Sequence, residues 1–275
     1  MAEHHPFPMK VRLPHAGGDI PPGASVVRAR PGFMAVAIAA CLSMPALHAQ
    51  SKNLDGEVAL SSQLVDRGVA ITPATPILQG AVSWTSPAGW SLGVSGSTEV
   101  RSPGRLVEAL ARASRYWSLS GDWQMQASAL YYRYPGNGRA RAYDRAETGV
   151  NWTYRDVLSL GVSAIYVIGA KEHRPRVAAD ASFHWPLPGR FSLSAGAGAA
   201  EATIAPYSPY HYEYAGSYRH VHAGGGLHGY GHVGLSWSGG HWRMQLDRIL
   251  ADPATRRQWD VMGASPWVAT ISRSF

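Results

Sequence analysis

The chain has 275 residues, of which 45% are hydrophobic and only 16% are charged, with 30 glycines, 10 tryptophans and 13 tyrosines. Its formal net charge is +7, but the lysines and arginines are scattered rather than set in one run, which argues against nucleic-acid binding. Low charge with abundant glycine and aromatic residues favours a structure whose outer face is not in water.

The N-terminal segment has the features of a secretory signal peptide. Arg28 and Arg30 precede a short apolar run, FMAVAIAACLSMPAL, which ends close to Ala49. Basic residues, a short apolar core and a small residue at the cut define such a peptide. We therefore expect an N-terminal extension and signal peptide over 1–49 and a mature domain over 50–275, exported to the cell envelope.

A lipoprotein cut before Cys41 is an alternative, because Ile-Ala-Ala-Cys loosely resembles the motif for lipid attachment. Cys41 is the only cysteine. Under the signal-peptide prediction it leaves with the peptide, so the mature chain has neither a disulfide nor a thiolate metal site.

The stretch 77–100 shows a pattern that recurs along the mature chain. Apolar residues alternate with small or polar ones on both sides of the Ser-Pro-Ala-Gly turn at 86–89. Successive strand side chains point to opposite faces, so this pattern predicts a β-hairpin with one apolar face. Trp84 and Trp90 flank the turn on that face, where a membrane barrel carries an aromatic girdle. A soluble, half-buried hairpin would have the same pattern. Whether the pattern recurs along the chain therefore distinguishes a membrane barrel from a soluble protein.

The pattern recurs about twelve times, with strand lengths near the roughly 9–11 residues that cross a bilayer. The predicted strands are 54–65, 77–86, 89–99, 114–121, 123–134, 143–155, 157–168, 176–186, 190–200, 217–238, 240–250 and 266–275. Short connections between them alternate with long ones, as in barrels with short periplasmic turns and long outer loops. We therefore predict an all-β, up-and-down antiparallel transmembrane barrel of about 12 strands in the Gram-negative outer membrane.

Charged residues share one face of the predicted strands, opposite the apolar face. A lipid-facing Arg or Lys at the bilayer midplane costs roughly 2–4 kcal/mol, so these side chains are expected in the lumen. We expect Glu57, Glu147 and Asp180 to partner Arg145 and Arg243. The predicted lumen residues are Glu57, Arg67, Arg145, Glu147, Asp180, His184, Arg243 and Asp247.

The chain ends in Phe275, on a strand whose Trp267, Ala269 and Ile271 share one face. A terminal Phe on such a strand resembles the signal that barrel assembly machinery reads in outer-membrane proteins. Arg273 departs from the apolar or aromatic residue usual at that position.

Residues 58–100 resemble the TorF-type porin family of small proteobacterial outer-membrane proteins. The similarity lies in an Arg-Gly corner at Arg67-Gly68, a Thr-Pro loop, a Gln-Gly strand at 79–80 and a Gly-aromatic strand at 89–93. The family usually has an aromatic residue before its Arg-Gly, whereas this chain has Asp66. The resemblance implies a porin-like barrel and leaves the solute open.

Arg67 has two interpretations. It could form an electrostatic constriction for anions, or it could simply pair with a nearby carboxylate such as Asp66 or Glu99. The helix-compatible stretch 106–112 is a further candidate for an inward constriction.

Other arginines gather toward the predicted outer rim, where they could bind lipopolysaccharide phosphates, draw anionic solutes inward, or remain as solvated loop charge. These predicted rim residues are Arg101, Arg105, Arg112, Arg139, Arg141 and Arg174.

His220, His222, His228 and His232 share parity on the predicted tenth strand, so a metal site is conceivable. No carboxylate accompanies them at tight spacing, and polar lumen histidines are the simpler interpretation. No local His-X-Ser pair suggests an outer-membrane hydrolase, although a triad assembled in space stays possible.

Together these observations predict an outer-membrane, porin-like channel for passive diffusion of small polar, including anionic, solutes. It would contact membrane lipid, lipopolysaccharide and the assembly machinery, and would be neither an enzyme nor dependent on a cofactor or metal. The alternative is a barrel without an open pore, which acts as an adhesin or structural protein or as a lipid-modifying hydrolase.

Overall fold

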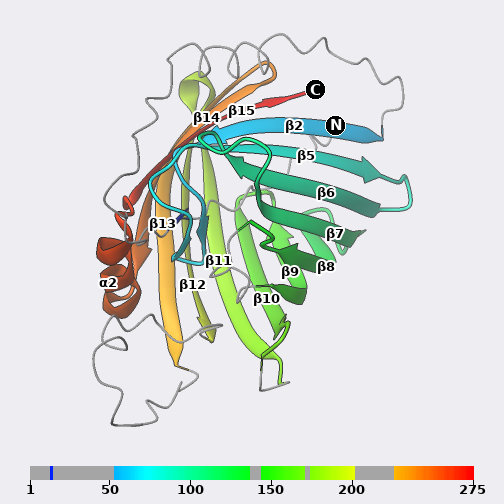
Figure 1. Cartoon of the computed structure of the whole chain (residues 1–275). Coiled ribbons are helices and arrows are strands. Elements are labelled where there is room, and N and C mark those ends of the chain that lie inside the picture. The colour runs from blue at the N-terminus through cyan, green and yellow to red at the C-terminus, as the bar shows by residue number, and fades with distance from the viewer. Residues whose placement is uncertain (1–12, 15–52, 137–143, 171–173, 202–225) are drawn as a thin grey trace, which may run out of the picture.

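Twelve antiparallel strands form one closed barrel, so the predicted fold class is confirmed (Figure 1). The computed structural model describes residues 13–14, 53–136, 144–170, 174–201 and 226–275. Apart from Leu13–Pro14, the expected signal peptide over 1–49 lies outside the described residues and stays a prediction. No helix within the described ranges is long and apolar enough to cross a membrane.

Each barrel strand pairs with the barrel strands that precede and follow it along the chain. A two-stranded hairpin interrupts this order between the first two of them, and a two-residue strand, β1, pairs in parallel with that hairpin. The elements are β1 (Leu13–Pro14), β2 (Leu54–Ser61), β3 (Val65–Asp66), β4 (Val69–Ile71), β5 (Ile77–Thr85), β6 (Trp90–Glu99), β7 (Leu106–Ser118), β8 (Trp123–Arg133), β9 (Arg145–Tyr154), β10 (Leu158–Val167), β11 (Arg176–Leu187), the 3-10 turn η2 (Pro188–Arg190), β12 (Phe191–Glu201), β13 (Leu227–Gly239), β14 (Trp242–Ala251), α2 (Pro253–Met262) and β15 (Trp267–Ser274).

The outward face of the barrel is apolar, as the alternation in the sequence predicts. On β6, Trp90, Leu92 and Val94 are 47%, 50% and 63% exposed, while Ser91 and Ser97 on the other face are buried. Large apolar side chains are this exposed on many of the other strands. A bilayer would cover such a surface, because burying apolar area away from water is favourable.

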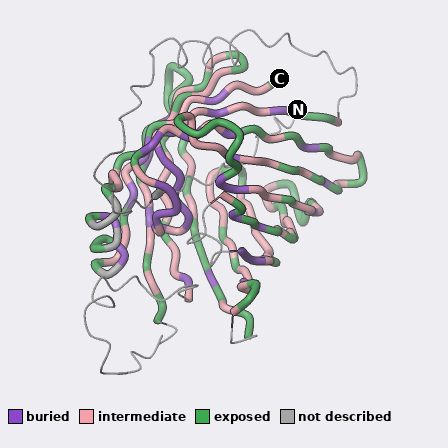
Figure 2. The backbone as a smooth tube through the Cα atoms, viewed as in Figure 1, coloured by how far each residue is buried: buried purple, intermediate pink, exposed green. Residues whose placement is uncertain are grey.

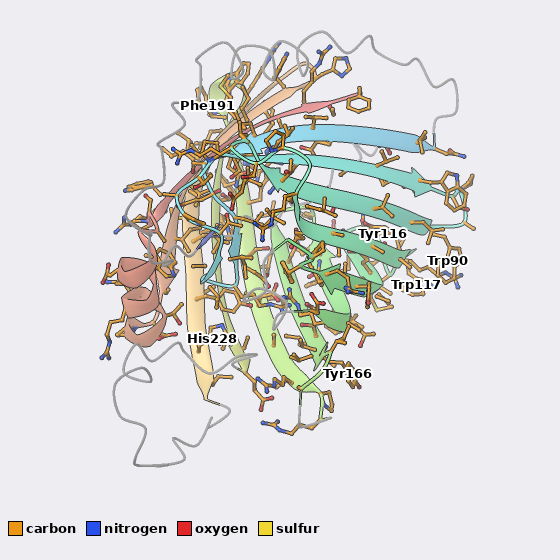
Figure 3. The ribbon with its side chains drawn as sticks, viewed as in Figure 1. Trp90, Tyr116, Trp117, Tyr166, Phe191 and His228 are labelled. Atoms are coloured by element: carbon orange, nitrogen blue, oxygen red, sulfur yellow. The ribbon has the colours of Figure 1, made fainter. Side chains whose placement is uncertain are left out.

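Aromatic residues gather outside the barrel at the end where the short turns lie. Trp90 and Trp117 are close together there, with Arg115 stacked against both rings at 5.3 and 5.2 Å (Figure 3). Trp123 and Tyr154 continue the band on the neighbouring strands, with ring centroids 5.1 Å apart. Amphipathic rings at one level of a barrel form a girdle at the membrane interface.

The short turns hold their predicted places. Arg155 and Asp156 both have positive φ, which is the backbone of a two-residue hairpin turn matched to strand twist. Arg155 also donates hydrogen bonds to both carboxylate oxygens of Asp122 in the neighbouring turn, at 2.8 and 3.2 Å. These bonds hold the pKa of Asp122 below its ordinary value.

Three predicted strand bounds differ from the structure. The first predicted strand, 54–65, ends at Ser61. β7 begins at Leu106 rather than near 114, because Ala109, Ala111 and Ala113 lie on its outward face, where small residues suit a strand as well as a helix. β13 begins at Leu227, and the first part of the predicted strand 217–238 lies outside the described residues. The final long connection also holds a helix, α2, that the sequence pattern did not predict.

Candidate functional site

The first long connection, residues 62–76, turns back into the barrel instead of standing outside it. Its strands β3 and β4 form a hairpin whose corner is Arg67-Gly68, with φ values of +48° and +73°. Glycine adopts this left-handed backbone freely, and Gly68 also lies so close to Tyr230 that a side chain would have no room. We call residues 62–76 the inner loop.

Apolar packing holds the inner loop from two sides. Val65 and Ala70 pack against Ile249, Val268 and the α2 residue Trp259. The indole of Trp259 also donates a hydrogen bond to the backbone oxygen of Gly68 at 3.0 Å. Figure 2 shows that buried residues gather in this part of the barrel.

On its other side, the inner loop packs on strands β5, β7 and β8. Leu64 and Ile71 form one buried cluster with Ile77, Val107 and Tyr132. Around the inner loop the lumen therefore contains two small hydrophobic clusters, whereas a water-filled channel would be lined by polar groups there.

Charged groups fix the corner of the inner loop to the barrel wall. Arg67 forms an ion pair with Glu147 on β9 and donates a hydrogen bond to Ser163 on β10 at 3.1 Å. Arg145 pairs with Asp66 at 2.5 Å and approaches Glu147 at 3.5 Å. We call these four residues, Asp66, Arg67, Arg145 and Glu147, the latch.

The latch is desolvated. The side chains of Arg67 and Glu147 are 9% and 3% exposed, and that of Arg145 is 2% exposed. Arg145 additionally lies over the Tyr132 ring at 4.0 Å, which is a cation–π contact. A buried charge is costly without a partner, so removing any one member should loosen the loop.

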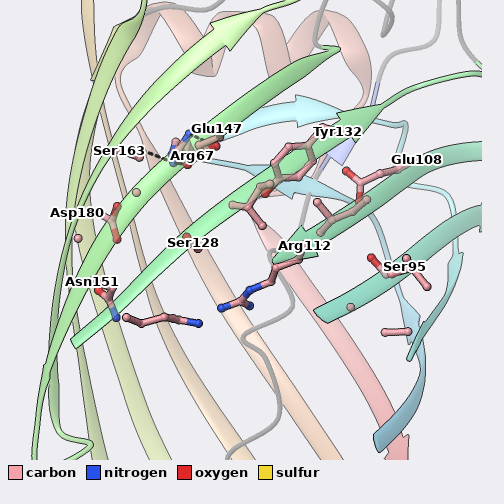
Figure 4. A pocket seen from close by; sticks show the side chains of 18 of the residues that line it. Arg67, Ser95, Glu108, Arg112, Ser128, Tyr132, Glu147, Asn151, Ser163 and Asp180 are labelled. Carbon is pink, nitrogen blue, oxygen red and sulfur yellow. Dashed lines mark hydrogen bonds and ion pairs between the residues drawn. The ribbon is translucent and has the colours of Figure 1, made fainter. Parts of the chain in front are cut away.

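A polar cavity of about 310 Å³ lies in the lumen beside the latch. Its walls come from β2 and from β5 to β11, and Figure 4 shows side chains converging on it from several of these strands. Serines and amides make up much of the lining, including Ser95, Ser97, Gln79, Gln126, Ser128, Asn151, Ser159, Ser163 and Ser182.

The cavity lining carries both signs of charge, with more acidic than basic residues. Its charged residues are Glu57, Arg67, Glu108, Arg112, Glu147 and Asp180. Outside the latch, the cavity walls carry three carboxylates and one guanidinium. A second void, of about 20 Å³, touches the latch on the side of His228 and Ala200.

Strand register places the predicted lumen residues on the inner face. Glu57, Arg67, Glu147 and Asp180 line the cavity, and Arg145 lies in the latch. The other three predicted lumen residues also lie on the inner face, because outward residues such as Trp185 and Met244 alternate with them; these three are His184, Arg243 and Asp247. The Gln245 amide donates a hydrogen bond to the Asp247 carboxylate at 2.8 Å. The expected pairing of Arg145 with Glu147 is found. The structure thus brings five of the eight together.

Three sequence predictions need correction. Arg67 does pair with a carboxylate, but its ion-pair partner is Glu147, 80 positions away, because the loop turns inward. Arg112 lies on β7 facing the cavity and is not at the outer rim. The stretch 106–112 is part of β7 in the barrel wall and does not fold inward as a helix.

The remaining rim residues divide into three groups. Arg101 and Arg105 are exposed in the connection between β6 and β7. Arg174 pairs with Glu201 at 3.1 Å, so its charge is already balanced. Arg139 and Arg141 lie outside the described residues.

His228 and His232 lie on the inner face of β13, as their parity predicts, while His220 and His222 lie outside the described residues. Within the described part of the chain, no three His, Cys, Asp or Glu side chains come together as a metal site. His232 instead covers Gly196, where a side chain would clash with the imidazole ring.

The sequence interpretation missed Ser163 and Trp259 as parts of the site, and it named Asp66 only as a possible partner for Arg67. A helix signal was present near Trp259: Asp252 precedes Pro253 and accepts a hydrogen bond from the Thr255 backbone at 3.0 Å, which is a typical N-cap. The apolar residues within the supposed outer loop were the signal that it folds inward.

No protein-family model matches the chain, and no curated protein matches it. Among solved structures, it is similar to the KdgM porin in complex with disordered oligogalacturonate, with a TM-score of 0.48 and 8% identity over 81% of this chain and 99% of that one. It is similar to the NanC porin, with a TM-score of 0.49 and 11% identity over 81% of this chain and 98% of that one. A third similarity is to the outer membrane protein OprD from Pseudomonas aeruginosa, with a TM-score of 0.36 and 10% identity over 82% of this chain and 66% of that one.

All three TM-scores are below 0.5, so we base the functional inference on the residues of this chain alone. The resemblance to TorF-type porins stays a prediction.

Proposed function

We propose that the protein is an outer-membrane channel of the porin type, through which small polar solutes diffuse passively. The observation that carries this proposal is a polar cavity of about 310 Å³ inside a barrel whose outward face is apolar. A lipid-facing exterior with hydrogen-bonding groups inside is the arrangement that lets polar solutes cross a membrane. The inner loop and its latch form the constriction that limits solute size.

The expected preference for anions rested on loop arginines and remains untested. Within the described residues, the cavity walls carry more carboxylates than guanidinium groups, which favours other solutes. Arg101 and Arg105 remain candidates for binding lipopolysaccharide phosphates, and Phe275 for recognition by the assembly machinery.

A barrel that does not conduct, acting as an adhesin or structural protein, is the second candidate function. The apolar packing on both sides of the inner loop favours it, because this packing occupies part of the lumen. The two candidates differ in whether the loop ever leaves its place.

Single-channel recording in a planar bilayer tests the proposal. The wild-type chain is compared with a variant in which residues 64–71 are replaced by a short Gly/Ser linker. We expect small discrete steps from the wild type and larger ones from the variant, because the linker removes the constriction. A folded wild type that never conducts, beside a variant that does, would instead support the closed barrel. Silence from both would exclude a channel along this lumen.

A further inference from the structure

The cavity presents opposite charges on facing walls. Arg112 reaches into it from β7 and Asp180 from β11, as Figure 4 shows. These strands are four steps apart in the barrel, and neighbouring strands are about 4.8 Å apart. The two side chains therefore enter the cavity from different parts of its wall.

Hydrogen-bonding groups line the cavity beside Asp180. The strand register aligns Asp180 with Gly161, Gly161 with Asn151, and Asn151 with Gln126, and this row reaches β7 at Tyr116, four positions from Arg112. Gly161 leaves room beside the carboxylate, since a Cβ there would lie only 3.0 Å from Asp180 Oδ1. The amides of Asn151 and Gln126 line the same cavity as the two charged groups, so they can form hydrogen bonds with a solute bound there.

The balance of charge argues against a purely anionic or purely cationic solute. Arg67, the other basic residue of the lining, is held in the latch by Glu147, so an anion would meet one guanidinium among the carboxylates Glu57, Glu108 and Asp180. A dication would place one of its charges near Arg112. A molecule with one charge of each sign suits both walls.

We propose that this cavity is a binding site for small zwitterionic solutes, with the cationic group at Asp180 and the anionic group at Arg112. The inference deepens the proposed channel function and rests on it, since it names the class of solute that the channel would pass. Binding itself does not require conduction.

The test uses four molecules that share a five-carbon chain and differ only at their ends: 5-aminovalerate, glutarate, cadaverine and 1,5-pentanediol. Their binding to the full chain folded in detergent micelles is measured by titration calorimetry. We expect 5-aminovalerate to bind most tightly. Asp180→Asn and Arg112→Gln should each weaken its binding about tenfold, which is the usual effect of losing one charge-assisted hydrogen bond.

Matched controls change the same charges away from the cavity. Asp156→Asn alters an exposed turn and Arg101→Gln an exposed loop, so both should bind 5-aminovalerate like the wild type. Asp180→Asn should also shift the preference toward glutarate, and Arg112→Gln toward cadaverine. Heat-modifiable gel migration checks that each variant is folded.

The proposed site would be overturned if glutarate, cadaverine or the diol bound as tightly as 5-aminovalerate, or if the two cavity variants left its affinity unchanged. Conduction is measured separately in bilayers. If the protein conducts but does not bind 5-aminovalerate, only the proposed binding site is rejected. If it binds 5-aminovalerate but does not conduct, only the proposed channel function is rejected.

Discussion

Phe275 and Gly56 meet at the seam that closes the barrel, where each donates its backbone N–H to the other's carbonyl oxygen at 3.0 Å. The Phe275 ring lies over Gly56 so closely that a Cβ at Gly56 would overlap it. The terminal residue is thus packed against the first barrel strand as well as being a candidate assembly signal. Arg273 occupies a position where an apolar residue is usual. Its guanidinium lies over the Trp242 ring at 5.6 Å, which is a cation–π contact.

Gly56→Val should weaken the seam, because the new side chain must displace the Phe275 ring. Overpacking of this kind typically costs about 1–3 kcal/mol. The free energy of unfolding by urea in lipid vesicles measures the effect. Gly80→Val is the matched control, since nothing lies within 4 Å of a Cβ there, and it should leave stability unchanged. Equal losses in both variants would show that the contact with Phe275 does not matter.

Val94→Arg tests whether the apolar exterior faces lipid. Val94 lies at the middle of β6 and is 63% exposed. A lipid-facing Arg near the bilayer midplane should cost about 2–4 kcal/mol, whereas Val94→Leu should be close to neutral. Unfolding titrations in vesicles measure both. A stable arginine variant would be difficult to reconcile with a bilayer around this face.

Thiol labelling tests the corrected position of Arg112. In a Cys41→Ser background, Arg112→Cys should react with a water-soluble, membrane-impermeant thiol reagent, because residue 112 faces the polar cavity. Ala111→Cys should be protected, since the adjacent residue faces lipid. The reverse pattern would mean that the β7 register is shifted by one residue, which exchanges the two faces of the strand.

The barrel could be predicted from the sequence because its information is local. Period-two alternation and short turns, such as the one at Arg155 and Asp156, identify the strands and hairpins. Because consecutive strands pair with each other, only the pairing of the last strand with the first is then needed to close the barrel. The alternation on β7 was ambiguous, since alanines favour helix and also suit a lipid-facing strand. This ambiguity is why Arg112 was expected at the rim.

The latch could not be predicted in this way because its partners are distant in sequence. Asp66 and Arg145 are 79 positions apart, and they meet only after the barrel closes and the inner loop folds inward. The sequence offered a carboxylate partner for Arg67, but it named only neighbouring carboxylates, whereas Glu147 is 80 positions away. Inward folding of Leu64, Val65 and Ile71 is driven by burial, and burial depends on the completed fold.

Glu147→Gln tests the latch most directly. It leaves Arg67 as a buried cation with a weakened partner, and breaking a buried ion pair on one side typically costs about 3–5 kcal/mol. We expect lower stability, faster proteolysis within residues 62–76, and more frequent or larger conductance steps, because the inner loop is released.

The exposed pair of Arg174 and Glu201 provides the comparison for that experiment. Glu201→Gln should cost less than about 1 kcal/mol and leave conductance unchanged, because solvent screens an exposed pair. Replacing Arg67 and Glu147 together by leucine should recover stability relative to Glu147→Gln, because no buried charge then lacks a partner. If Glu147→Gln unfolds no more easily than Glu201→Gln, the latch does not hold the inner loop, and the apolar clusters around Leu64 and Val65 must hold it alone.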